Sequence, residues 1–160
     1  MDETKQQLTD NETRKHIMRV RDFLSEAIVD LVIRVAKHDK SKLEEPEASV
    51  FAEFTPKLKG VTYGSDQYNE YLQGMGVALG HHYAVNPHHP EHWGNGVDGM
   101  TLIDLLEMIC DWAAATERHE NGDIVVSIAK NTERFGLSPQ LAQILLNTVT
   151  TMKIGKRKGE

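Results

Sequence analysis

The chain has 160 residues, of which 39% are hydrophobic and 26% charged, a composition typical of one ordinary globular domain. The net charge of −6 and the aromatic content of 6% argue against a nucleic-acid partner, which needs clustered Lys and Arg or stacking aromatic side chains. A single cysteine, Cys110, excludes an internal disulfide, and no apolar run could span a membrane, so we expect a cytoplasmic protein without a membrane partner.

Helical spacing dominates the first forty residues. Thr9 and Glu12 form a capping-box pattern, and apolar residues then recur in steps of three and four from Ile17 to Val35. This pattern predicts one long amphipathic helix over residues 10–38.

The next segment is interrupted by turn-forming residues. Residues 40–64 combine charges with two prolines and two glycines, so we predict a loop that contains one short helix at 50–54. Ser65 can cap a second long helix, which the apolar spacing predicts over 65–83. Three glycines weaken this helix by about 1 kcal/mol each relative to alanine: Gly74, Gly76 and Gly80.

A loop and three helices complete the chain. Residues 85–99, VNPHHPEHWGNGVDG, contain prolines and glycines that end regular structure. Three further helices are predicted over residues 101–119, 121–136 and 138–154, opened by Thr101, by residues 121–123 and by Ser138. The predicted fold is therefore all-α: a single-domain helical bundle of about five main helices over 1–152, followed by a basic flexible tail at 153–160.

Histidine and carboxylate residues indicate a divalent metal site. Five of the eight histidines lie within residues 81–92. Imidazole is the commonest protein ligand for transition metals, and carboxylates complement it where water is activated. An adjacent pair, His38 and Asp39, closes the first predicted helix, where a change in backbone direction can aim both side chains at one ion. Glu107 and Asp111 share one face of a later helix.

Simpler explanations remain for each of these features. His38 could stabilise a helix C-terminus through its charge, and the histidines of the loop could be solvated on a rigid surface. Asp104 is expected to cap a helix rather than to bind an ion. Lys42 could pair with Glu45 on the surface, although beside a metal it would suit a phosphate. A helical protein without any metal therefore stays an open alternative.

The motifs resemble two groups of proteins. HDKSK at 38–42 resembles the His-Asp-x-Gly-Lys signature of the HD superfamily of metal-dependent phosphohydrolases, with Ser41 where glycine is usual. HHYAVNPHH at 81–89 lies where those proteins place later histidines, and ICDWAAAT at 109–116 is similar to their final Asp-containing helix. The chain resembles still more closely, over nearly its whole length, a family of small, largely phage-encoded helical proteins catalogued as a domain of unknown function.

The HD resemblance implies a set of ligands for one or two ions of Mn, Mg, Co, Ni, Fe or Zn: His38, Asp39, His82, His89 and Asp111. For the neighbouring histidines the resemblance does not decide whether they are ligands: His81, His88 and His92. HD proteins also place a histidine on an earlier helix, and His16 is the only upstream candidate. In a straight helix the 22 residues between His16 and His38 span about 33 Å, which excludes shared coordination unless the helix breaks near Ser25.

The same resemblance implies a function. We expect an HD-like, metal-dependent phosphohydrolase that acts on a nucleotide or related phosphate ester, in which Lys42 steadies the substrate while Glu91, His88 or Glu107 handles protons. The alternative is a non-catalytic phage accessory protein, working in the host cytoplasm, with a structural metal site and a protein partner. A homodimer could also form through the apolar face of the last helix, which otherwise packs internally: Leu141, Ile144, Leu145 and Val149.

Overall fold

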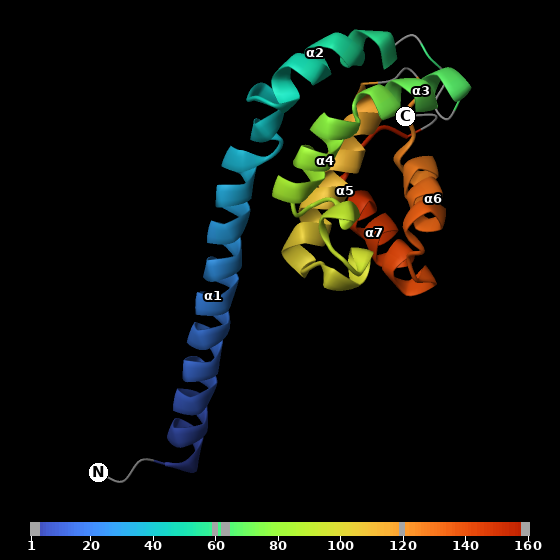
Figure 1. The fold of residues 1–160 in the computed structure, drawn as a ribbon. Helices are drawn as coiled ribbons and strands as arrows, with labels where there is room; N and C mark the ends of the chain where they lie inside the picture. The colour runs from blue at the N-terminus through green and yellow to red at the C-terminus, as the bar shows by residue number, and fades with distance from the viewer. Residues whose placement is uncertain (1–3, 59–60, 62–64, 119–120, 158–160) are drawn as a thin grey trace. The chain divides into compact units, whose positions relative to one another are not determined.

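The computed structural model describes residues 4–58, 61, 65–118 and 121–157 (Figure 1). These residues form seven α-helices and three short 3-10 helices, and no strand occurs among them, which confirms the all-α prediction. None of the described helices combines the length and the apolar character that crossing a membrane requires. Contacts divide the chain into an N-terminal unit that ends at Lys37 and a C-terminal unit that begins at His38.

The N-terminal unit is the single helix α1, Lys5–Lys37. It begins earlier than predicted because Thr4 and Gln7 cap it reciprocally: Gln7 N donates to Thr4 Oγ1 (3.2 Å) and Thr4 N donates to Gln7 Oε1 (2.7 Å). The prediction of a cap at Thr9 was wrong. Thr9 lies inside the helix, where its hydroxyl donates to the Lys5 carbonyl (3.0 Å).

The C-terminal unit opens with the 3-10 helix η1, Lys40–Leu43, and the helix α2, Glu47–Leu58. α2 is longer than the short helix predicted at 50–54, because it starts directly after Pro46 and continues past Pro56 in its last turn. The earlier start places Glu47 in the first turn, where its side chain is completely buried.

The helix predicted over 65–83 is two helices, α3 at Asp66–Gly74 and α4 at Gly76–Val85. Ser65 caps α3 as predicted, accepting from Tyr68 N at 3.2 Å. The chain turns at the buried Met75 between two glycines. A Cβ at Gly74 would lie 2.6 Å from the ring of Phe54, so the glycine allows α2 to pack closely there.

Two further 3-10 helices, η2 at Pro90–His92 and η3 at Gly96–Gly99, occupy the predicted loop. Three helices then follow with the predicted caps: α5 at Leu102–Glu117, α6 at Ile124–Phe135 and α7 at Pro139–Met152. Their apolar faces form the core, to which α7 contributes Leu145 and Val149. Two members of the α7 face that was considered for a dimer, Leu145 and Val149, therefore pack internally, whereas Ile144 is exposed.

Residues 153–157 differ from the predicted flexible tail. Ile154 packs against the core, and Gly155, at φ 77°, lies against Ile124 and Ala113. Ile124 N donates to the Lys156 carbonyl (2.8 Å), and Lys156 N donates to Thr116 Oγ1 on α5 (3.1 Å). This C-terminal strap, residues 153–157, is thereby held across α5 and α6. The rest of the predicted tail, 158–160, lies outside the described residues.

Candidate metal centre

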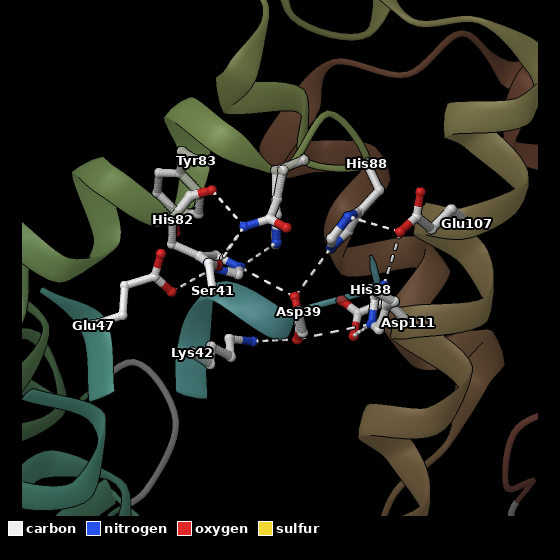
Figure 2. Close-up of polar contacts among 12 residues, drawn as sticks. His38, Asp39, Ser41, Lys42, Glu47, His82, Tyr83, His88, Glu107 and Asp111 are labelled. Carbon is white, nitrogen blue, oxygen red and sulfur yellow. Dashed lines mark hydrogen bonds and ion pairs between the residues drawn. The ribbon is translucent and has the colours of Figure 1, made fainter. Parts of the chain in front are cut away.

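Segments far apart in the sequence converge on one cluster within the C-terminal unit (Figure 2). Its members are His38 and Asp39 before η1, His82 on α4, His88 and His89 in the loop after α4, and Glu107 and Asp111 on α5. Asn86 helps to bring the loop to the turn, because its amide donates to the His82 carbonyl (2.8 Å) and to Ser41 Oγ (2.9 Å).

Asp39 stands at the centre of the cluster. Its backbone is left-handed, at φ 54°, which turns the chain sharply after His38 and directs its carboxylate inward. Oδ1 lies 3.4 Å from His82 Nε2 and 3.5 Å from His88 Nε2, whereas Oδ2 accepts from Lys42 Nζ and lies 3.7 Å from His38 Nε2. The two oxygens thus face two different sets of side chains.

The first set, which we call the histidine group, comprises Asp39, His82, His88 and His89. Each offers one donor atom, and all four atoms lie within 4.8 Å of one another. The two closest, His82 Nε2 and His89 Nε2, are 2.9 Å apart. Donors about 2.1 Å from a common transition-metal ion are separated by about 3.0 to 3.4 Å when they are adjacent, so the arrangement fits such an ion.

Two atoms of the histidine group are buried and unsatisfied. Asp39 Oδ1 and His88 Nε2 have no hydrogen-bond partner among the described residues. Burying an unpaired carboxylate oxygen and an unpaired imidazole nitrogen is unfavourable, and such groups are rare in folded proteins. A cation between them would satisfy both atoms.

Carboxylates behind the histidines orient the rings. Glu47 is fully buried, with Oε2 2.9 Å from His82 Nδ1 and Oε1 2.7 Å from His81 Nδ1. Burial raises the pKa of Glu47, but hydrogen bonds from His81 and Ser41 outweigh it, so the carboxylate is ionised and can only accept. His82 Nδ1 therefore donates to Glu47, and the lone pair of Nε2, which faces His89 Nε2 at 2.9 Å, can turn to a bound ion instead. In the same way, Glu107 Oε1 lies 3.2 Å from His88 Nδ1 and can orient that ring.

The second set, which we call the aspartate group, comprises His38, Asp39 and Asp111. His38 Nε2 lies 3.7 Å from Asp111 Oδ1, and His38 Nδ1 lies 2.9 Å from Glu107 Oε1. Asp39 belongs to both groups and could bridge two ions. Side chains of the cluster could therefore hold one ion or two.

The charge states differ between the two groups. Burial, together with the nearby His88 and His82, lowers the pKa of His89 to about 3, so its imidazole is neutral and able to coordinate. The nearby carboxylate of Asp111 and the hydrogen bond to Glu107 raise the pKa of His38 to about 10. An ion entering the aspartate group must therefore displace the imidazolium proton of His38, whereas the neutral His89 carries no such proton.

A comparison with known protein families covers the whole cluster. A family model described as "Family of unknown function (DUF5662)" matches residues 5–151. The chain belongs to this family. No curated protein and no solved structure matches it. Membership of DUF5662 confirms the resemblance to an uncharacterised family that the motifs suggested.

In this DUF5662 chain all five ligands implied by the HD resemblance lie in the two groups, and His88, one of the ambiguous histidines considered for proton transfer, joins the histidine group as a fourth donor. The other ambiguous histidines lie outside both groups: His81 contacts Glu47, and His92 Nδ1 donates to the Tyr83 carbonyl (2.8 Å). His16 is on α1, which continues unbroken past Ser25, so the break that its role required does not occur.

The residues predicted to handle substrate and protons have defined partners. Lys42 binds Asp39, and Glu107 contacts both His38 and His88. Glu91 accepts from Arg134 Nη2 at 2.7 Å. Sequence reasoning missed Glu47 altogether, because it lay in a predicted loop and its histidine partners are 34 and 35 residues away along the chain.

A cleft of about 780 Å³ reaches the cluster. His89 and Asp111 lie on its wall, so each group contributes one member. Four basic residues also line it: Lys130, Arg134, Lys156 and Arg157. Trp112 and Phe135, whose rings stack with centroids 6.2 Å apart, add an apolar surface. We call this feature the basic cleft.

Proposed function

We propose that the chain is a metal-dependent phosphohydrolase, related to the HD superfamily, that cleaves a small phosphorylated compound such as a nucleotide. One observation carries the proposal: the basic cleft places donors from both candidate metal groups beside four cationic side chains. A phosphate ester needs both features, because its charge must be neutralised while its phosphorus is attacked.

The residues of the chain would divide this work. The histidine and aspartate groups would hold the ions, with His82 and His88 fixed by carboxylates. A bound divalent ion lowers the pKa of water toward neutrality and neutralises phosphate oxygens. Arg157 and Lys156 come from the C-terminal strap and would bind the phosphate, while Glu91 lines the cleft and could take up a proton.

The order of motifs supports the same proposal. The HD-like segment 38–42 contributes His38 and Asp39, and the last HD-like segment contributes Asp111. Ser41 replaces the usual glycine and accepts a hydrogen bond from Asn86 (2.9 Å), so this departure has a local structural role.

A turnover assay tests the proposal. Purified protein should be incubated with Mn²⁺, Mg²⁺, Co²⁺ or Ni²⁺ and a panel of nucleotides and phosphate esters, and phosphate release measured. We expect turnover with at least one metal, its loss in Asp39→Asn, and its retention in His16→Ala. Lys156→Ala should raise KM more than it lowers kcat, because this side chain binds the phosphate. Absence of turnover with every metal would reject hydrolysis.

A second candidate follows from the histidine group itself. Its four protein donors could fill the coordination sphere of one ion, and closed spheres are typical of structural sites. The chain would then be a non-catalytic accessory protein, such as a phage product that binds a host protein. Tight metal binding and a metal-dependent melting temperature, without turnover of any substrate, would favour this function.

A further inference from the structure

Lys42 lies beside the candidate metal centre, where the proposed hydrolysis gives it no task. Its Nζ donates to Asp39 Oδ2 (Figure 2) and lies 5.5 Å from the ring centroid of Phe51 on α2. Lys42 and Asp39 share the turn at η1, since they are three positions apart. The side chain of Lys42 is 32% exposed, so its ammonium can leave Asp39 for solvent without disturbing a packed core.

The two oxygens of Asp39 therefore differ in their access to a cation. Oδ1 is buried without a hydrogen-bond partner among the described residues, and so is His88 Nε2, which lies 3.5 Å away. Oδ2 already accepts a hydrogen bond from the positive charge of Lys42. A divalent ion at Oδ1 would satisfy two unpaired atoms, whereas an ion at Oδ2 has to displace the ammonium or be repelled by it.

Distances between the donor atoms favour the histidine group as well. Within it, His82 Nε2 lies 2.9 Å from His89 Nε2 and 3.4 Å from Asp39 Oδ1. In the aspartate group, His38 Nε2 lies 3.7 Å from both Asp39 Oδ2 and Asp111 Oδ1. Adjacent donors of one transition-metal ion are about 3.0 to 3.4 Å apart. The aspartate group therefore has to contract around an ion, whereas the histidine group is already close to this spacing.

From these contacts we infer that the two groups fill in a fixed order and that Lys42 sets this order. The histidine group takes the first ion. The ammonium of Lys42 serves as the second cation of the centre, at Asp39 Oδ2, until a second ion displaces it from the aspartate group. Lys42 is thus a positioning residue that acts through Asp39. The inference rests on the metal centre of the proposed function, but it does not depend on turnover.

Titration of the metal-free, full-length chain with Mn²⁺ tests this order, because electron paramagnetic resonance measures the free ion at each step. We expect the wild type to bind one ion tightly and a second at least about tenfold more weakly. Lys42→Met removes the ammonium and retains a stem of similar length. The second ion should then bind at least about tenfold more tightly than in the wild type, while the affinity for the first ion changes less.

Two control variants separate the charge of Lys42 from a general effect of charge. Lys42→Arg retains a cation at this position and should keep the second ion weak. Lys40→Met removes a charge from an exposed side chain of the same 3-10 helix and should leave both affinities nearly unchanged. A gain in Lys40→Met equal to that in Lys42→Met would reject the order.

Three further results would overturn the inference: a wild type that binds two ions with equal affinity, a wild type that binds none, or a folded Lys42→Met chain whose second ion stays weak. If Lys42→Met does not fold by circular dichroism, Asp111→Asn replaces it. This variant should lose the weak ion and retain the tight one, and loss of the tight ion would reject the order.

Failure of the proposed hydrolysis would be distinct from failure of this inference. Ordered binding of Mn²⁺ without turnover of any phosphate ester would reject hydrolysis alone. Turnover by a chain that binds two equivalent ions would reject the order alone.

Discussion

Glu47 is the residue whose role depends most on the folded structure. It is buried between His81 and His82 and accepts from both. Glu47→Gln removes the charge that fixes the His82 tautomer, so we predict a metal affinity about 10 to 100 times weaker. Competition against a chromogenic chelator measures this change.

Glu53→Gln is the matched control for that substitution. Glu53 lies on the same helix, is exposed, and pairs only with Lys57 among the contacts described for it. Its replacement should leave the affinity unchanged. Equal affinities in a folded Glu47→Gln protein and in the control would show that the carboxylate does not orient His82.

The contacts of His38 predict that the stability of the chelator-treated protein depends on pH. Its pKa is raised from 6.5 to about 10 by the nearby carboxylate of Asp111 and by the hydrogen bond to Glu107. The stability that it contributes is therefore fully present below about pH 6.5 and is lost as the pH rises toward 10. The difference in free energy of unfolding between wild type and His38→Gln should shrink over this window in urea titrations. A constant difference would contradict the assigned hydrogen bonds.

Most members of the cluster were recognisable in the sequence by residue type. His38, Asp39, His82, His89 and Asp111 stood out because imidazoles and carboxylates clustered in recognisable motifs. His88 was ambiguous and assigned to proton transfer, since nothing local shows that its Nε2 lies 3.5 Å from Asp39. Glu47 was missed because its partners are 34 and 35 residues away along the chain.

Helix ends were predictable wherever the signal was local. Ser65, Thr101 and Ser138 cap the helices that they were expected to open. Asp123 caps α6 from within the segment 121–123 that was expected to open it. The break at Met75 was not predicted, because the apolar spacing continues across it, and the close contact of Phe54 with Gly74 joins positions on two different helices. Thr4 and Thr9 both precede a suitable residue by three positions, so the sequence alone did not show which one begins α1.

The C-terminal strap predicts a stability difference between two glycines of positive φ. Gly155 (φ 77°) and Gly136 (φ 63°) are both strained by any Cβ, but a Cβ at Gly155 would also lie 2.9 Å from Ile124 Cβ, whereas Gly136 faces open space. Gly136→Ala should cost about 1 kcal/mol, and Gly155→Ala about 2 kcal/mol or more. Urea denaturation of both variants measures this, and equal losses would show that the strap is not packed on α6.

Substitution of Gly80, in contrast, is predicted to stabilise the protein. It lies in the interior of α4, where nothing stands within 4 Å of a Cβ. Gly80→Ala should therefore raise the free energy of unfolding by about 0.5 to 1 kcal/mol through better helix propensity. A destabilised variant would mean that close approach of another segment requires this glycine.

The whole chain combines one long amphipathic helix with a unit that contains the imidazoles, the carboxylates and the basic cleft. The helical class followed from periodicity along the chain. The cleft could not be predicted from this periodicity, because it forms where the C-terminal strap, α5 and α6 meet. The composition of strap residues 153–157 had predicted a flexible tail. Contacts across long sequence separations determine such features, and local patterns do not contain them.

The central claim is that Asp39 and its neighbouring histidines bind a divalent metal. The most direct test incubates the purified chain with a metal mixture, removes unbound metal by gel filtration and measures the bound metal by elemental analysis. We predict one or two transition-metal ions per chain, none in Asp39→Ala, and the full complement in His16→Ala. A wild-type chain that emerges without metal, or an Asp39→Ala chain that retains it, would contradict the account.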